Sequence, residues 1–401
     1  CSKVLRIANT SDLTRFENEL DIAIQRLENA EKALALATND GDAQAIAYAK
    51  EAVENASKEV LTSLENNYES LSEIEQFLAE NESKNSESTN AKVAEMLATQ
   101  ANLENNKPQS ALVSRYSNTA LSEMSANVNV ALQIARNLDR HLLSQDNSNV
   151  WANTESTKQN YHSDFYRPYK QSLTMTQIGV ANNVNDNVRV GAVLSHSRAN
   201  NTFAENVSGK NRLTALSTYV KGNWNNGVFA SLDLGYGRSR NTIDFDGKNN
   251  VFHRSLFSAG VNAGIQWNWG VNVQPSIGIR YNRLSKANYH LAEAKVENKA
   301  LNLMTYRAGL ELSKTFDVAG VKLTPSVASY YNDATQRKMA VNGALSVNNI
   351  GMQQQFGRYF NHEAGLAAQF NQWQVSAQVG MLKGSDITTQ KYAAFKLGYT
   401  W

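Results

Sequence analysis

The sequence predicts a transmembrane β-barrel of twelve antiparallel strands with a helix through its pore, preceded by an acidic α-helical segment. Apolar and polar residues alternate with a period of two from residue 149 to the end, tight turns alternate with long polar connections, and a polar helical segment precedes the first strand. An even strand count places both ends of the barrel on its short-turn, periplasmic side. Any chain that lies N-terminal and outside must therefore pass through the lumen.

The net charge of +2 over 401 residues is the sum of two unlike parts. Residues 1–110 hold 10 Lys+Arg and 20 Asp+Glu, a net of −10, whereas 111–401 hold 29 and 17, a net of +12. All but four of the Phe, Tyr and Trp residues also follow residue 110. We therefore expect three units, which are an acidic helical linker at 1–110, a linker and pore-spanning helix at 111–148, and a barrel at 149–401.

Two apolar stripes at helical spacing predict a hairpin or coiled coil in the acidic unit, roughly at 12–38 and 42–80. Gly41 and Asp42 between them supply a helix stop and the cap of the next helix. A polar linker at 81–90 and a shorter helix at 91–104 are expected to follow. This unit is either a solvated helical stalk or a spacer that binds a partner.

Residues 117–143 predict a helix about 40 Å long, enough to cross a bilayer core of about 30 Å. No run of hydrophobic letters in the chain exceeds five residues, which excludes an apolar membrane-spanning helix. The helix at 117–143 is too polar for lipid, so within a membrane it requires a polar enclosure. Its polar positions are Asn118, Asn127, Asn129, Gln133, Arg136 and Asn137.

Strands are predicted wherever the alternation has a period of two, most clearly in the last segment of the chain. The twelve segments are 149–156, 171–182, 187–198, 211–224, 227–239, 253–269, 270–282, 300–315, 320–332, 356–371, 372–383 and 389–401. The tight turns between them are Asn225–Gly227, Trp269-Gly270, Val318–Gly320 and Asn371-Gln372, and the long connections are 157–170, 199–210, 240–252, 283–299 and 333–355. Alternating short and long connections are typical of an outer-membrane barrel.

A soluble β-sandwich would show the same alternation, so alternation alone does not decide between the two folds. Aromatic residues near the predicted strand ends favour the barrel, because such residues form girdles at membrane interfaces. They are Trp224, Trp267, Trp269, Tyr281, Tyr330, Tyr331, Tyr399 and Trp401. Pro275 and Pro325 fall inside predicted strands, and we expect both near the periplasmic ends, where a bulge could absorb the lost hydrogen bond.

Several segments of the chain closely resemble the C-terminal translocator of monomeric autotransporters (type V secretion), of the IgA1 protease and adhesion and penetration protein type. The resemblance covers about residues 114–401 and leaves out the acidic unit. The segments are Ser114–Ser122, Asp139-Arg140, Val150–Thr154, Tyr166–Gln171, Gln177–Val180, Ser195–Phe203, Phe356–Arg358 and Lys396–Trp401.

The resemblance implies a twelve-stranded outer-membrane barrel, plugged by a helix, that mediates export of its own N-terminal passenger to the cell surface. It implies as partners the outer-membrane lipid, the barrel assembly machinery, periplasmic chaperones and the passenger, with a monomeric barrel, the helical arm at the cell surface and no nucleic acid. Ala393, Phe395, Leu397, Tyr399 and Trp401 resemble the family's C-terminal assembly signal, read as an exposed strand.

Parity along the strands identifies charged residues that would line the lumen. They are Arg189, Asp233, Arg280, Arg307, Glu311, Glu363 and Lys396. A barrel lined by both signs of charge could wet an export path and then hold a polar helix as a plug. The same residues could instead form an ion-pair network that serves stability alone.

No enzyme site is expected in this chain. A Gly-Asp-Ser-Gly nucleophile segment is absent, and the six His residues are scattered without a partnered Ser and Asp. His362-Glu363 lacks the second His of a zinc helix, so we expect no catalytic residue, metal or cofactor. A serine protease, where the parent protein has one, would belong to a passenger outside this chain.

Two alternatives and one negative expectation remain. The chain could be an outer-membrane porin or a surface adhesin whose helical arm binds, and Cys1 could be a lipidated N-terminus. One subfamily of autotransporters cleaves itself inside the pore at an Asn-Asn pair. Here Val128 separates Asn127 from Asn129, so we expect no cleavage within 117–143.

Overall fold

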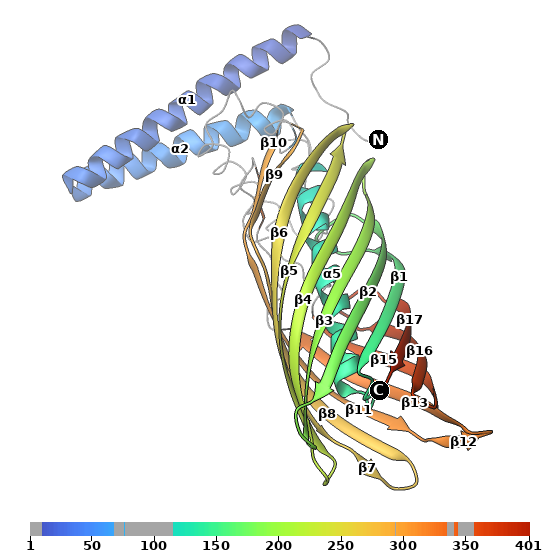
Figure 1. The fold of residues 1–401 in the computed structure, drawn as a ribbon. Helices are drawn as coiled ribbons and strands as arrows, with labels where there is room; N and C mark the ends of the chain where they lie inside the picture. The colour runs from blue at the N-terminus through green and yellow to red at the C-terminus, as the bar shows by residue number, and fades with distance from the viewer. Residues whose placement is uncertain (1–9, 68–75, 77–114, 293, 335–340, 344–356) are drawn as a thin grey trace.

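The computed structural model describes residues 10–67, 76, 115–292, 294–334, 341–343 and 357–401. Within these residues it comprises a helical hairpin and a closed barrel with a helix inside (Figure 1). No helix among the described residues combines the length and apolarity needed to span a bilayer. The expected linker at 81–90 and helix at 91–104 lie outside the described residues.

The hairpin consists of α1 (Thr10–Asp40) and α2 (Ala43–Asn67). Gly41 separates them with a φ of 74°, a left-handed conformation that glycine adopts without strain, and the Asp42 carboxylate accepts a hydrogen bond from the Gln44 amide at 3.0 Å. The stop and cap inferred from the sequence therefore act as expected. Apolar side chains buried between the helices hold them together, namely Leu20, Ile24, Leu27, Val53, Val60 and Leu64.

Twelve strands close the barrel, since β8 pairs with β11 and β17 pairs with β1. Every neighbouring pair in the ring is antiparallel. Their bounds are β1 Val150–Tyr161, β2 Tyr169–Asn183, β3 Val188–Phe203, β4 Val207–Asn223, β5 Val228–Phe245, β6 Lys248–Ile265, β8 Asn272–Leu284, β11 Leu301–Ser313, β13 Val321–Ala334, β15 Arg358–Phe370, β16 Trp373–Lys383 and β17 Gln390–Tyr399. Each overlaps one predicted segment, with bounds that differ by several residues in places, so the strand count of the barrel is confirmed.

The connections opposite the tight turns differ from expectation. The predicted loops 199–210 and 240–252 are mostly strand, and only 204–206 and 246–247 remain as turns. Asn, Thr, Lys and Arg residues had suggested loops there, but the hydrogen-bonded ladders continue through them. The 283–299 connection contains the hairpin of β9 (Ala287–Leu291) and β10 (Ala294–Asn298), and β10 also pairs with β14 (Val341–Gly343).

Pro275 and Pro325 lie near the tight-turn ends of β8 and β13, as expected, but neither sits in a bulge. The ladder is interrupted instead. Opposite Pro275 the pairing stops after β6 and resumes at β7 (Trp267–Asn268), and opposite Pro325 it stops after β11 and resumes at β12 (Phe316–Val318). The register is the same on both sides of each gap, so each proline removes pairing without inserting a residue.

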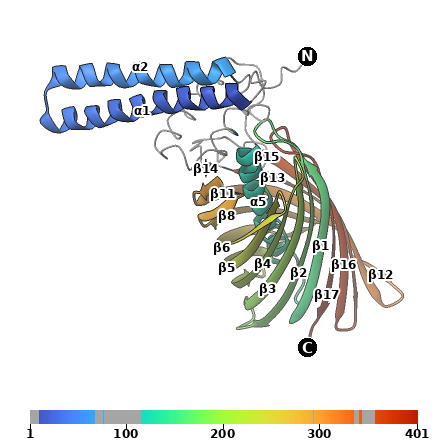
Figure 2. The same ribbon diagram turned by 90° about the horizontal axis from the view of Figure 1, so that it is seen from above.

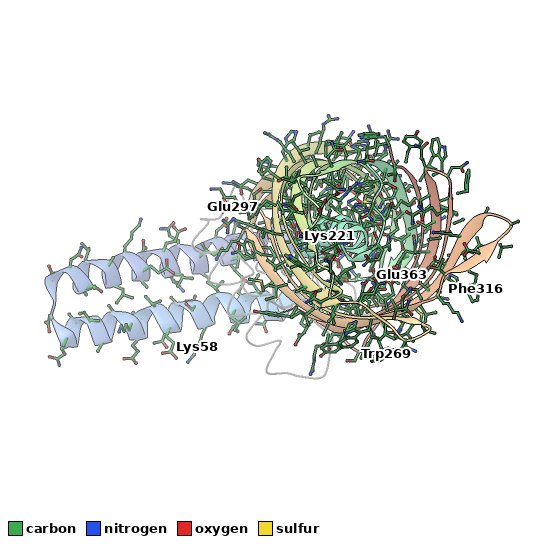
Figure 3. All side chains as sticks on the ribbon, turned by 60° about the horizontal axis from the view of Figure 1, so that its bottom comes forward. Lys58, Lys221, Trp269, Glu297, Phe316 and Glu363 are labelled. Carbon is green, nitrogen blue, oxygen red and sulfur yellow. The ribbon has the colours of Figure 1, made fainter. Side chains whose placement is uncertain are left out.

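The outer face of the ring is apolar, and its exposed hydrophobic side chains include Ile178, Leu216 and Leu232. Aromatic residues lie at both edges of this band, Trp224, Trp269 and Trp401 at the tight-turn edge and Tyr236, Phe257, Tyr306, Tyr331 and Phe360 at the opposite edge. Tyr330 is an exception to the girdle predicted from the sequence, because its ring is only 8% exposed and packs inside against Leu143 and Phe229. Trp269 and Phe316 point outward in Figure 3, whereas Lys221 and Glu363 lie within the ring.

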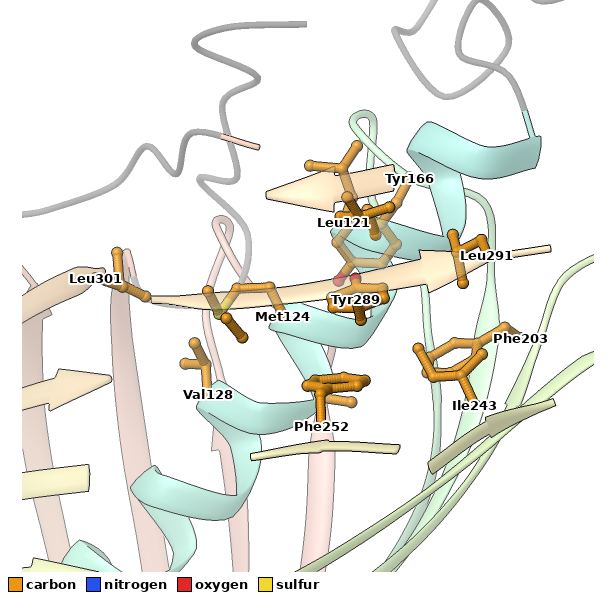
Figure 4. Packing of buried hydrophobic residues seen from close by; sticks show 14 of the residues in the cluster. Leu121, Met124, Val128, Tyr166, Phe203, Ile243, Phe252, Tyr289, Leu291 and Leu301 are labelled. Carbon is orange, nitrogen blue, oxygen red and sulfur yellow. The ribbon is translucent and has the colours of Figure 1, made fainter. Parts of the chain in front are cut away.

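The helix α5 (Arg115–Leu143) runs through the lumen, from the end that carries the 246–247 turn to the end where the chain terminates (Figures 1 and 2). Its first half is surrounded by a hydrophobic cluster that the β9–β10 hairpin completes (Figure 4). Leu121, Met124 and Val128 of α5 pack there with Phe252 of β6 and Tyr289 of β9. The predicted pore helix at 117–143 is therefore present.

Candidate functional site

The outermost contact of α5 is made by its first residue. Arg115 donates two hydrogen bonds to the Asp246 carboxylate, at 2.6 and 2.8 Å, and its guanidinium lies over the Phe245 ring at 4.2 Å. These hydrogen bonds, more than the charge of Arg115 itself, lower the pKa of Asp246. Asp246 is half exposed in the turn beyond β5, so this contact ties the helix to the rim of the barrel.

About two turns deeper, Glu123 pairs with Arg254 of β6 through two hydrogen bonds, one of them 2.8 Å long. Both side chains are almost completely buried. Tyr289 and Asn298 also donate to the Glu123 carboxylate, each at 3.3 Å. A charge pair in so dry a site is tolerated because both members are paired and hydrogen-bonded.

The polar residues of the helix face the barrel wall. Asn118 accepts a hydrogen bond from the Arg167 amide at 2.6 Å, and the side-chain amide of Asn129 donates to Tyr169 and Gln171, each at 3.0 Å. Asn127 donates to the Glu123 side chain and accepts from Asn211 of β4 at 2.8 Å, and Gln133 donates to the Glu155 carbonyl at 3.2 Å. Asn137 accepts from Arg140 at 2.6 Å. Asn118, Asn127, Asn129 and Gln133 thus each have a partner outside α5, whereas Asn137 is bonded within the helix.

Two arginines of α5 pair with two carboxylates on the same side of the ring, on strands β1 and β15 that are separated by β16 and β17. Arg136 donates to both oxygens of the buried Glu155 of β1, at 3.1 and 2.6 Å. Arg140 joins Glu155 at 3.2 Å to Glu363 of β15 at 2.9 Å. The helix therefore links strands that lie on either side of the β17–β1 closure.

A second network centres on Asp139, on another face of α5. Its carboxylate accepts a hydrogen bond from Arg280 of β8 at 2.7 Å and lies 3.2 Å from the Arg307 guanidinium of β11. Arg280 also donates to Asp233 of β5, at 2.8 Å through each terminal nitrogen. Two carboxylates and two guanidinium groups thus balance, and they tie the helix to three strands.

Lumenal donors cap the C-terminal end of α5. Lys221 donates to the Ser144 carbonyl at 2.7 Å, Gln274 to the Leu143 carbonyl at 2.9 Å, and Arg189 to the Asn147 carbonyl at 2.8 Å. Lys396 lies 2.7 Å from Asp146. Gln274 thus binds the last carbonyl of the helix, the other donors bind the segment that follows it, and their positive charges lie near the negative end of the helix dipole.

Of the seven lining residues proposed from parity, all point to the interior. Six contact α5, the segment that follows it or a residue bound to α5, and Glu311 borders a cavity of about 80 Å³ between α5 and the wall. Sequence reasoning missed Glu123 and Arg254, which form the most buried ion pair among the described residues, and Glu155, which pairs with two arginines. Glu155 shares its parity with inward-facing Trp151, so the same rule extended to β1 would have found it.

The five residues of the C-terminal segment alternate outward on the last strand. β17 pairs with β16 and with β1 along its length, and the segment is fastened beyond it by a hydrogen bond from the Trp401 amide to Asn149 at 2.8 Å. Tyr399 packs edge-on against Trp373, with ring centroids 4.9 Å apart. In the closed barrel this strand has no free edge.

A family model described as the autotransporter β-domain matches residues 150–380, more than half of the chain. The chain belongs to the autotransporter β-domain family. It is 36% identical over 295 residues to an adhesion and penetration protein autotransporter of Haemophilus influenzae, covering 73% of this chain and 20% of that protein. It is also 30% identical over 326 residues to an immunoglobulin A1 protease autotransporter of the same species, covering 78% of this chain and 17% of that protein.

Solved structures show the same fold. The translocator domain of autotransporter NalP from Neisseria meningitidis superposes with a TM-score of 0.55 at 15% identity, covering 70% of this chain and 98% of that one. The β-domain of the Bordetella autotransporter BrkA gives 0.51 at 17% identity, covering 64% and 100%. The present chain is therefore mostly an autotransporter translocator domain of the bacterial outer membrane, and it spans about a fifth of the length of the curated relatives it matches.

Proposed function

We propose that this autotransporter domain exports a passenger attached upstream of α1, and that α5 then stays in the lumen as a plug. The contacts of α5 support this proposal best. Ion pairs bind it to β1, β6, β8, β11 and β15, and donors from three strands cap its end, so the barrel wall is built to hold this helix.

The direction of export follows from the course of the helix. The chain after α5 enters β1 at the tight-turn end of the barrel, and α5 begins at the opposite rim beside Asp246. A segment N-terminal to α5 therefore lies on the far side of the membrane from the C-terminus. We assign the α1–α2 hairpin to the cell surface and treat residues 1–110 as linker, 111–148 as the plug unit and 149–401 as the barrel.

The partners follow from the same proposal. A barrel with an apolar outer band needs outer-membrane lipid, and its unfolded chain needs periplasmic chaperones before insertion. We propose that Ala393, Phe395, Leu397, Tyr399 and Trp401 are recognised by the barrel assembly machinery as an unpaired strand, before β1 covers that edge. We assign no catalytic activity to the chain itself, and a single copy to each barrel.

Surface display and conductance together test the proposal. A folded reporter peptide fused upstream of residue 1 should become accessible to added protease on intact cells that express the chain. The refolded chain in planar bilayers should pass little current, and deletion of residues 115–143 should open it. A steady pore in the intact chain would indicate a porin, and a reporter that stays inside the cell would contradict export.

The assembly signal is tested separately. Trp401→Ser together with Phe395→Ser should reduce the fraction of heat-modifiable, folded barrel in the membrane, whereas Trp269→Ser, at an exposed aromatic position in another strand connection, should leave it nearly unchanged. Equal losses for the two variants would mean that the aromatic belt as a whole matters and that the last strand is not read as a signal.

A further inference from the structure

A row of positive side chains crosses the outer face of four neighbouring strands. Arg198 of β3 lies directly opposite Arg212 of β4, and Arg212 lies directly opposite Arg240 of β5. Arg240 is in turn opposite His253 of β6. All four side chains are exposed and point away from the lumen. The strand register thus aligns three guanidinium groups side by side.

This alignment is unfavourable without a counter-charge. Directly opposed residues on one sheet face have Cβ atoms about 4.5–5.5 Å apart, and like charges in that position destabilise the sheet. Within the part of the chain that the structure describes, no carboxylate forms an ion pair with Arg198, Arg212 or Arg240. Arg238 and Lys210, one outward position away on either side, add charge of the same sign. We therefore expect an anion from outside the chain to bind this row.

The position of the row indicates where that anion lies. Two outward positions closer to the tight-turn end, the same strands present Leu194, Leu216, Tyr236 and Phe257, which form the exposed apolar edge of the membrane band. The separation is four residues, or about 13 Å along a strand at about 3.4 Å per residue. On a tilted strand the row therefore lies about 10 Å outside the apolar band, at the level of the polar headgroups.

An apolar groove lies further down the same outer face. It has a volume of about 520 Å³ over β2 to β5, and its lining includes Val180, Gly191, Ala192, Val220 and Leu232. Ala192 is six residues from Arg198 on β3, about 20 Å along the strand. The distance between the arginine row and the groove is thus of the order of one acyl chain.

We propose that this face binds a phosphorylated lipid of the outer leaflet, with its phosphates against the Arg198–Arg212–Arg240 row and one acyl chain in the groove. Guanidinium groups suit phosphate because their planar fork donates two parallel hydrogen bonds to it. A phosphate placed between adjacent arginines would also relieve their mutual repulsion. The groove favours a lipid over inorganic phosphate as the ligand, because only a lipid has an acyl chain that fills it.

Native mass spectrometry of the refolded full chain in detergent tests the proposal, with diphosphoryl lipid A as the probe. The variant Arg198→Gln/Arg212→Gln/Arg240→Gln should lose at least about tenfold in affinity, since each basic residue near a charged lipid surface contributes substantially. The matched control Lys158→Gln/Lys383→Gln/Lys391→Gln removes three exposed, outward charges on β1, β16 and the start of β17, and it should retain binding. Heat-modifiable gel migration verifies that both variants are folded.

The nature of the ligand is tested with three further arms. Dephosphorylated lipid A should bind at least tenfold more weakly, and millimolar inorganic phosphate should not displace the lipid. Ala192→Phe, which fills the groove, should weaken lipid binding several-fold while the arginine row is intact. Equal affinity for the two lipids, full displacement by phosphate, no effect of groove filling, or equal losses in the arginine and lysine variants would overturn the proposal.

Discussion

Glu123 of the lumenal helix and Arg254 of β6 are joined by two hydrogen bonds in a site where both side chains are almost completely excluded from solvent. The pair lies beside Phe252 and Tyr289, within the hydrophobic cluster that surrounds the first half of α5. The ion pair is thus enclosed by apolar side chains. Removal of either partner leaves an unpaired charge where water does not reach.

Glu123→Ala or Arg254→Ala should destabilise the docked helix by about 3–5 kcal/mol, because each leaves its partner charged and buried. The double variant Glu123→Leu/Arg254→Met should recover most of that loss, since apolar residues of similar volume suit the same site. Urea titration of the refolded barrel in detergent, followed by protease cleavage within α5, measures the change.

The exposed pair Arg26–Glu59 in the α1–α2 hairpin provides the control, and Arg26→Ala should cost less than about 1 kcal/mol. If the Glu123 and Arg26 variants behaved alike, burial would not govern the strength of the Glu123–Arg254 pair. If the double variant were as unstable as either single one, packing would outweigh charge at this site.

Much of the barrel follows from local patterns that the sequence displays. Alternation with period two reports which face a residue occupies, so the strand count and the inward position of residues such as Arg280 and Lys396 could be predicted. Polarity in residues 117–143 predicted an enclosed helix for an equally simple reason. Lipid offers no hydrogen-bond partner to the side chains of Asn129 and Gln133, whereas a polar lumen does.

The partners of each lumenal residue could not be predicted in the same way. The pairing of Asp139 with both Arg280 and Arg307 depends on the rotation and depth of α5 relative to strands more than 130 residues away, and periodicity carries no such information. The predicted loops 199–210 and 240–252 failed for another reason. Polar residues can continue a ladder beyond the membrane, because water solvates their outer faces.

Asp139→Asn should loosen the plug, because Arg280 keeps Asp233 as a partner while Arg307 loses its only ion-pair carboxylate among the described residues. We expect more frequent brief openings of the pore in planar bilayers. Asp317→Asn removes an exposed carboxylate in the β12 segment and should leave the current unchanged. If Asp139→Asn opened no more often than the unmodified chain, the other contacts of α5 would suffice to hold the helix.

The Arg115–Asp246 pair should make the outer end of the helix sensitive to acid. Its hydrogen bonds lower the pKa of Asp246 in the folded chain, so the pair stabilises the folded state fully above the unfolded pKa of about 3.9. That contribution is lost as the pH falls through the lower, folded pKa. Pulsed hydrogen exchange should therefore show amides 116–120 well protected near pH 7 and less protected below about pH 4.

Asp246→Asn should show the weaker protection already at neutral pH, with a smaller change on acidification. Asp244→Asn, in the same turn region, lacks an ion pair with a described residue and serves as the control. Protection of 116–120 that is equal at both pH values in the unmodified chain would mean that the rim contact contributes nothing to helix docking.

The helix should also remain uncut in the barrel. Asparagine cleaves a chain when its side-chain nitrogen attacks its own backbone carbonyl, so that nitrogen must be free to turn. Here the Asn127 amide donates to the Glu123 side chain, and the Asn129 amide donates to Tyr169 and Gln171 at 3.0 Å. Both nucleophiles are therefore held, and intact mass should persist during days of incubation of the refolded chain at 37 °C.

Val128→Asn separates this explanation from the absence of an Asn-Asn pair. The variant creates such pairs on both sides of position 128 while the hydrogen bonds of Asn127 and Asn129 remain available. We expect the bond after Asn127 to stay intact, because the Asn127 amide still donates to Glu123. No such hydrogen bond is assigned to the side chain introduced at position 128, so only the bond after Asn127 tests the explanation. Cleavage after Asn127 in Val128→Asn, and not in the unmodified chain, would show that the pair itself decides. A fragment that ends within 117–143 from the unmodified chain would contradict the expectation altogether.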